Sequence, residues 1–134
     1  MNGALAVNFN TVNLIVSQDG MIRSAEKQTP TLPIMQTLGE RLSPGSHRIN
    51  ISQDPENVLR HVGELFRALQ ERCGIPGFGE IIVKKTPEDL QPLYTYYSSK
   101  RLSDIIEEMM LYSNNFIANQ LYLYMGARES GYPA

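Results

Sequence analysis

Residues 5–23 read LAVNFNTVNLIVSQDGMIR, and this stretch decides the fold of the first half of the chain. Residues 5–16 are rich in Val, Leu, Ile, Phe and Thr, which suit the half-buried surface of a β-strand. Asp19 and Gly20 then form a dipeptide that is favoured in tight hairpin turns, because such turns need residues that tolerate positive φ. Residues 21–23 resume the apolar pattern. The stretch therefore predicts a β-hairpin.

Beyond the hairpin, the pattern predicts a short helix over residues 34–42 and a short strand over residues 47–51. Residues 54–56, Asp-Pro-Glu, are a strong helix start, since Asp accepts from free N–H groups and Pro tolerates the first helical position. The apolar residues that follow fall on one face of this helix: Val58, Leu59, Val62, Leu65, Phe66 and Leu69. Gly74 ends the helix, and residues 80–85 predict another strand.

The second half of the chain is helical by the same criteria. Residues 102–111 carry apolar side chains at helical spacing, and the pattern resumes from residue 116. The change of character over residues 85–97 marks a candidate boundary between a strand-rich segment, 1–85, and a helical segment, 86–134. We therefore expect an α+β fold, with a β-hairpin or short sheet and packed helices.

Composition narrows the possible functions. The chain has 134 residues, of which 42% are apolar, and a net charge of −2, so we expect no nucleic-acid partner. Cys73 is the single cysteine, which excludes an internal disulfide and gives no support to a Cys-based metal site. No run of residues approaches the length of a transmembrane helix.

Ser113-Asn114-Asn115 interrupts the two helical patterns of the second half. Ser and Asn are poor helix-interior residues, but they present donors and acceptors well in a loop. The surrounding stretch, residues 112–121 (YSNNFIANQL), resembles the S-x-N region of the penicillin-binding D-alanyl-D-alanine carboxypeptidase and endopeptidase family, low-molecular-mass class C. The resemblance extends to residues 98–106 and, further back, to residues 4–11 and 28–30.

This resemblance implies a fragment of a β-lactamase or transpeptidase-like fold with an inserted domain. Residues 1–85 would then belong at least partly to the insert, and residues 86–134 to the helical part of the transpeptidase domain. Such enzymes use a nucleophilic Ser in S-x-x-K, an S-x-N loop and a K-T-G strand. They act on D-Ala-D-Ala peptides of peptidoglycan through an acyl-enzyme, without metal or organic cofactor, in the periplasm or cell envelope.

Two literal matches to the other motifs do not fit their chemistry. Ser24-Ala25-Glu26-Lys27 leads into two prolines, whereas the chemistry needs Ser and Lys one helical turn apart. Residues 84–87, Lys-Lys-Thr-Pro, place Pro where the family has Gly and precede Ser113 in the chain. We therefore expect the nucleophile upstream and the K-T-G strand downstream, both outside these residues, and an inactive isolated chain.

By resemblance, Ser113 and Asn115 are the candidate catalytic residues, and Asn115 also binds substrate. The Ser113 hydroxyl would bond the catalytic lysine and help to relay a proton, and the Asn115 amide would hold the peptide carbonyl of a peptidoglycan peptide or a β-lactam. Asn114 would shape the turn. The alternative role for Ser113 and Asn115 is that of interhelical cap.

Two further expectations concern the chain as a whole. The alternative function is a non-catalytic wall-binding or protein-interaction module that uses the Ser113 loop structurally. An isolated fragment could expose apolar surface and dimerise.

Of the two histidines, His61 borders the apolar stripe of its helix, and we expect a partly buried imidazole with hydrogen-bond partners rather than a ligand or base.

Overall fold

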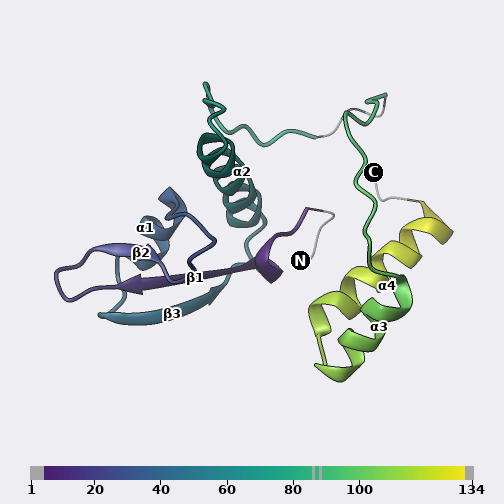
Figure 1. Cartoon of the computed structure of the whole chain (residues 1–134), viewed down its shortest axis with the longest axis horizontal. Helices are drawn as coiled ribbons and strands as arrows, with labels where there is room; N and C mark the ends of the chain where they lie inside the picture. The colour runs from purple at the N-terminus through teal and green to yellow at the C-terminus, as the bar shows by residue number, and fades with distance from the viewer. Residues whose placement is uncertain (1–4, 86, 88, 132–134) are drawn as a thin grey trace. The chain divides into compact units, whose positions relative to one another are not determined.

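The computed structural model describes residues 5–85, 87 and 89–131, which form two compact units, Met1–Lys84 and Lys85–Ala134. The first element is a 3-10 turn, η1 (Asn8–Asn10). The elements that follow are labelled in Figure 1: β1 (Thr11–Val16), β2 (Ile22–Ser24), α1 (Pro33–Gly39), β3 (Gly45–Asn50), α2 (Pro55–Arg72), α3 (Leu102–Leu111) and α4 (Asn115–Ser130). A small antiparallel sheet with packed helices confirms the α+β class. None of the helices described is long and apolar enough to cross a membrane.

The first unit is built on a three-stranded antiparallel sheet in the order β2-β1-β3. The predicted hairpin is present, with Leu14 opposite Ser24 and Val16 opposite Ile22. At its turn, Gly20 has φ 83°, a conformation that glycine adopts without steric cost. The first strand is shorter than predicted and begins at Thr11, because the three residues of η1 before it have positive φ and break the extended chain.

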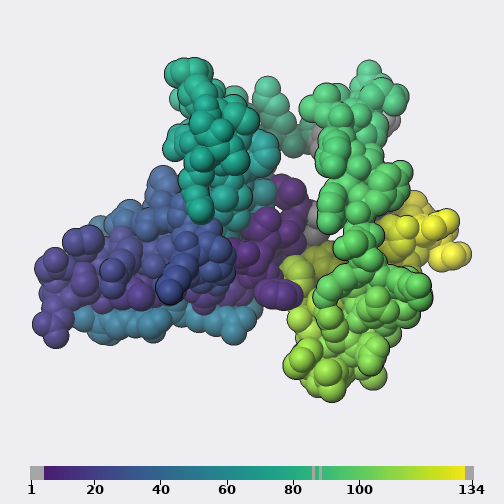
Figure 2. Space-filling view, viewed as in Figure 1, coloured from purple at the N-terminus to yellow at the C-terminus, as the bar shows by residue number. Residues whose placement is uncertain are grey.

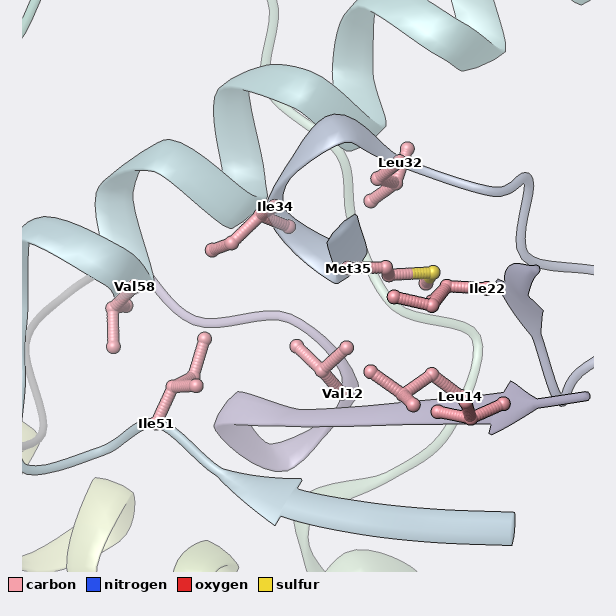
Figure 3. Close-up of a cluster of buried hydrophobic side chains, with 9 residues drawn as sticks. Val12, Leu14, Ile22, Leu32, Ile34, Met35, Ile51 and Val58 are labelled. Atoms are coloured by element: carbon pink, nitrogen blue, oxygen red, sulfur yellow. The ribbon is translucent and has the colours of Figure 1, made fainter. Parts of the chain in front are cut away.

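The core of this unit lies between the sheet, α1 and the start of α2 (Figure 3). β1 contributes alternate side chains to it, as a strand with one buried face does. The buried apolar residues are Val12, Leu14, Val16, Ile22, Leu32, Ile34, Met35, Ile51 and Val58. Burial of each large side chain contributes about 1.5–3 kcal/mol, so this cluster is the main source of the unit's stability.

Helix α2 begins as predicted, but its buried face overlaps the predicted apolar stripe only in part: Val58 is buried and Leu65 packs against the core. The Asp54 side chain accepts hydrogen bonds from the backbone N–H groups of Glu56 and Asn57, at 3.1 and 3.2 Å. The buried residues of the helix are Val58, His61 and Glu64. Phe66 and Leu69, members of the apolar stripe, are 64% and 41% exposed. The end of α2 extends beyond the sheet (Figure 2), so part of the apolar stripe faces solvent.

The predicted strand over residues 80–85 is wrong. These residues form irregular, exposed chain and pair with none of the three strands. Ile81 packs instead on α2 at Gly63, where a Cβ atom on the glycine would lie 2.5 Å from the Ile81 Cγ2 atom. A β-patterned run becomes a strand only where a neighbouring strand supplies its hydrogen bonds, and here the run follows a helix surface.

The second unit consists of an exposed extended segment followed by α3 and α4. Both helices begin within one residue of the positions at which the sequence patterns begin, 102 and 116. The Asp104 carboxylate accepts a hydrogen bond from the Arg101 N–H at 3.2 Å, and Lys100 forms an ion pair with Glu108 at 2.6 Å. These contacts fix the start of α3. The assignment of the two segments to an inserted domain and a transpeptidase domain stays a prediction.

Candidate functional site

The turn between α3 and α4 has a defined geometry. Helix α3 ends in a Schellman motif, in which Asn114 N–H donates to the Met109 carbonyl at 2.9 Å and Ser113 N–H approaches the Met110 carbonyl at 3.4 Å. Ser113 occupies the left-handed position of this motif, with φ 50°. Glycine is the usual residue at that position, because a Cβ atom is crowded there.

Asn114 ends one helix and starts the next. Its side-chain oxygen accepts a hydrogen bond from the Ile117 N–H at 3.1 Å, and its carbonyl accepts one from the Ala118 N–H at 3.1 Å. Asn114 is therefore the N-cap of α4. The prediction that it shapes the turn is confirmed. The capping role that was the alternative for Ser113 and Asn115 belongs to Asn114 instead.

The two nominated side chains lie on either side of this cap and are exposed. Ser113 precedes Asn114, and Asn115 is the first residue of α4. Within the described part of the chain, neither the Ser113 hydroxyl nor the Asn115 amide has a hydrogen-bond partner. The backbone is thus held by hydrogen bonds, while the two polar side chains remain available to a ligand.

The backbone conformation of Ser113 is unfavourable for a residue with a side chain. The left-handed region costs a non-glycine residue about 1–2 kcal/mol. Nothing in the local fold requires a hydroxyl there, because the Schellman bonds and the cap use the backbone of Ser113 and the backbone and side chain of Asn114, but not the side chain of Ser113. Strain of this kind at an exposed polar residue is a reason to look for function.

A comparison with family models matches residues 16–134 to the D-Ala-D-Ala carboxypeptidase 3 (S13) family. The chain belongs to this family. Neither the comparison with curated proteins nor that with solved structures finds a match. The S13 family model covers the turn, so the inferred relation to D-Ala-D-Ala carboxypeptidases is confirmed. The catalytic roles of Ser113 and Asn115 in this S13 family member stay predictions.

The two literal motif matches have no catalytic geometry in this S13 chain. Ser24 is the last residue of β2, and its hydroxyl donates to the Glu26 carbonyl at 3.2 Å. The segment from Ser24 to Lys27 is not helical, so the two side chains are not stacked on one helix face. Lys84 and Lys85 lie in exposed irregular chain, and Thr86 is outside the described residues.

The expectation for His61 is wrong in both parts. The residue is 1% exposed rather than partly buried, and both ring nitrogens lack a hydrogen-bond partner among the described residues. Burial lowers its pKa below the ordinary value of 6.5, and the charges of Glu64 and Glu26 act in the opposite direction. The spacing of Val58, His61 and Glu64 at every third residue was the available sign that these three side chains share a face.

Glu64 holds α1 and α2 together beside this imidazole. Its carboxylate accepts from the Ile34 N–H at 2.6 Å, at the N-terminal turn of α1, and from the Arg60 Nε–H at 2.7 Å. Glu26 likewise accepts from the Asn13 amide and the Thr29 hydroxyl, each at 2.7 Å. The described residues contain no group of three or more His, Cys, Asp or Glu that could hold a metal ion. We assign the Glu64 contacts to stability.

Proposed function

We propose that this chain is the part of a serine-type D-Ala-D-Ala carboxypeptidase or endopeptidase that supplies the S-x-N loop. The observation that supports this most is the left-handed Ser113 between two helices, in a chain of the D-Ala-D-Ala carboxypeptidase 3 family. A serine at a position where glycine is sterically preferred is accounted for by a use for its hydroxyl. Membership of the family supports the substrate class.

In the proposed reaction, a nucleophilic serine attacks the carbonyl carbon between the two D-alanines. An ester to the enzyme forms, the peptide bond breaks, and the terminal D-alanine leaves with the proton that came from the serine. The Ser113 hydroxyl relays that proton together with the catalytic lysine, and the Asn115 amide holds the peptide carbonyl of the substrate. Water then hydrolyses the ester. No metal or organic cofactor takes part in this scheme.

We place the nucleophile and the K-T-G strand outside these 134 residues. Ser24 sits at a strand end and Lys84 in irregular chain, so neither literal motif has the geometry that its role needs. The isolated chain is then inactive. The complete protein acts on peptidoglycan peptides in the periplasm or cell envelope and is acylated by β-lactams.

The test is the intact mass of the protein after incubation with penicillin. It is applied to these residues alone and to the complete native protein that contains them. We expect a covalent adduct on the complete protein only, and Ser113→Ala or Asn115→Ala in that protein should slow acylation by orders of magnitude without a large loss of stability. An adduct on the short chain would implicate Ser24. No adduct on either protein would leave the non-catalytic wall-binding module as the better interpretation.

A further inference from the structure

Asn114 takes part in both helix ends of the turn, which gives it a role that the S-x-N pattern itself does not assign. Its N–H group completes the Schellman motif of α3 by donating to Met109, and its side chain caps α4 by accepting from Ile117. The residue before it is the strained Ser113, and the residue after it is Asn115. Asn114 therefore contacts both helix ends, through its backbone N–H toward α3 and through its side-chain oxygen toward α4.

We propose that Asn114 is a positioning residue for acylation: its cap holds Ser113 in the left-handed conformation and fixes the direction of the Asn115 amide. This inference rests on the proposed function, because it assumes that Ser113 and Asn115 meet the reacting groups. Asn114 itself touches neither substrate nor nucleophile in this scheme. It contributes to acylation by holding its two neighbours, Ser113 and Asn115, in position.

The turn between α3 and α4 is sterically costly. Ser113 pays the steric penalty of a left-handed residue, and its own hydrogen bond to Met110 is long, at 3.4 Å. The shorter bonds that close the turn, at 2.9 and 3.1 Å, both involve Asn114. Loss of the side-chain bond frees the first turn of α4 to fray, because the Ile117 N–H then has no partner within the helix.

Fraying at this position moves the Asn115 amide directly, since Asn115 is the first residue of α4. It also releases Ser113 toward the ordinary φ range, which swings its hydroxyl to another direction. A misplacement of about 1 Å in an acylation site costs about 100-fold in rate. A capping bond that touches no reacting group thus controls a rate, and not only a melting temperature.

The experiment compares three changes at Asn114 in the complete native protein. Asn114→Ala removes the capping oxygen, whereas Asn114→Asp and Asn114→Ser keep one, and Asn, Asp and Ser are about equal as N-caps. We expect the acylation rate constant for penicillin to fall about 10- to 100-fold in Asn114→Ala and to stay within about threefold of wild type in the two capped variants. The non-covalent dissociation constant of penicillin should change less than the rate constant.

A matched control comes from the other unit. Asp54 caps α2 by the same kind of contact, accepting from Glu56 N–H at 3.1 Å. Asp54→Ala should lower the melting temperature by an amount similar to that in Asn114→Ala, and it should leave the acylation rate constant unchanged. The comparison separates loss of a helix cap in general from loss of this one.

The outcomes are distinct. Equal acylation rates in Asn114→Ala and Asp54→Ala would overturn the positioning role. Slow acylation in all three Asn114 variants would also overturn it, because loss of the capping oxygen would then not be the cause of the slow acylation. Normal acylation in Ser113→Ala would instead overturn the proposed function on which the inference rests. Slow acylation in Ser113→Ala together with normal acylation in Asn114→Ala would reject the positioning role alone.

Discussion

The buried imidazole of His61 makes the first unit sensitive to acid, and His61→Leu tests this. The ring is 1% exposed, and its two nitrogens have no partner among the described residues. An unsatisfied buried polar group costs about 1–3 kcal/mol. Leucine has a similar bulk and no polar atom, so we expect the variant to be more stable than wild type by about 1 kcal/mol at pH 7.5, after some loss from imperfect packing.

The pH dependence gives the sharper test. Burial lowers the pKa of His61 in the folded state below the value of 6.5 in the unfolded chain, so the unfolded state binds more protons as pH falls below 6.5. The contribution of His61 to wild-type stability is therefore greatest above pH 6.5 and falls by up to about 1.4 kcal/mol per pH unit below it, until the folded ring also protonates. At pH 5.0 this loss is at most about 2 kcal/mol.

The measurement is urea unfolding at several pH values between 7.5 and 5.0, followed by the methyl NMR signals of Leu14, which belong to the same core. Subtracting the His61→Leu curve from that of wild type removes the pH dependence that the two proteins share. Glu64 and Glu26 are the carboxylates whose charges act on the ring. His47→Leu, in β3, is the matched control for removing a histidine. A difference that stays constant across this range, or narrows toward acid, would refute the reasoning.

Three further predictions follow from the contacts described. Ser113→Gly should stabilise the second unit by about 0.5–1 kcal/mol in thermal unfolding, because glycine adopts φ 50° freely. The same change should slow acylation of the complete protein by orders of magnitude, and unchanged acylation would contradict a role for the hydroxyl. Glu64→Gln should destabilise the first unit by about 1–3 kcal/mol in urea unfolding, since the amide cannot replace both carboxylate contacts, to Ile34 and Arg60. A variant as stable as wild type would show that these contacts contribute nothing. Phe66→Ser should reduce self-association of the isolated chain in sedimentation velocity, because the Phe66 ring is 64% exposed. An unchanged association constant would exclude this face of α2 as the surface through which two chains associate.

Local signals in the sequence were sufficient for much of the fold. Asp19-Gly20 located the hairpin turn, Asp54 located the start of α2, and the spacing of apolar residues located α3. Each of these features depends on residues that are close in sequence, and their geometry follows from side-chain capping, turn conformation and helical period. Such features are decided before tertiary packing.

The errors concern properties that only packing decides. Residues 80–85 have a strand pattern but meet α2 instead of a strand edge, and nothing in the run itself reveals its neighbour. On α2, apolarity identified only part of the buried face, because His61 and Glu64 are buried beside Val58 while Phe66 is exposed. A buried carboxylate is unexpected from composition, and its hydrogen bond to Ile34 N–H explains it only once the fold is known.

The candidate site was located by sequence, but its geometry was not. Ser113, Asn114 and Asn115 are all good capping residues, so the sequence did not identify which one caps α4. The left-handed conformation of Ser113 was also hidden, because glycine or asparagine is the usual sign of it. Family membership leaves the location of the site and the roles of these three residues to experiment.

The overlap of two helix ends on Asn114 has a consequence for how this segment tolerates changes in length. One residue serves as the last position of one motif and the first of the next, so the joint contains no spare residue. A single-residue insertion between Ser113 and Asn115 would place the end of the Schellman motif and the N-cap of α4 on different residues. A deletion would remove one motif altogether. Sequence drift at this joint is therefore restricted to substitutions, whereas the exposed chain over residues 89–99 has no such constraint on its length.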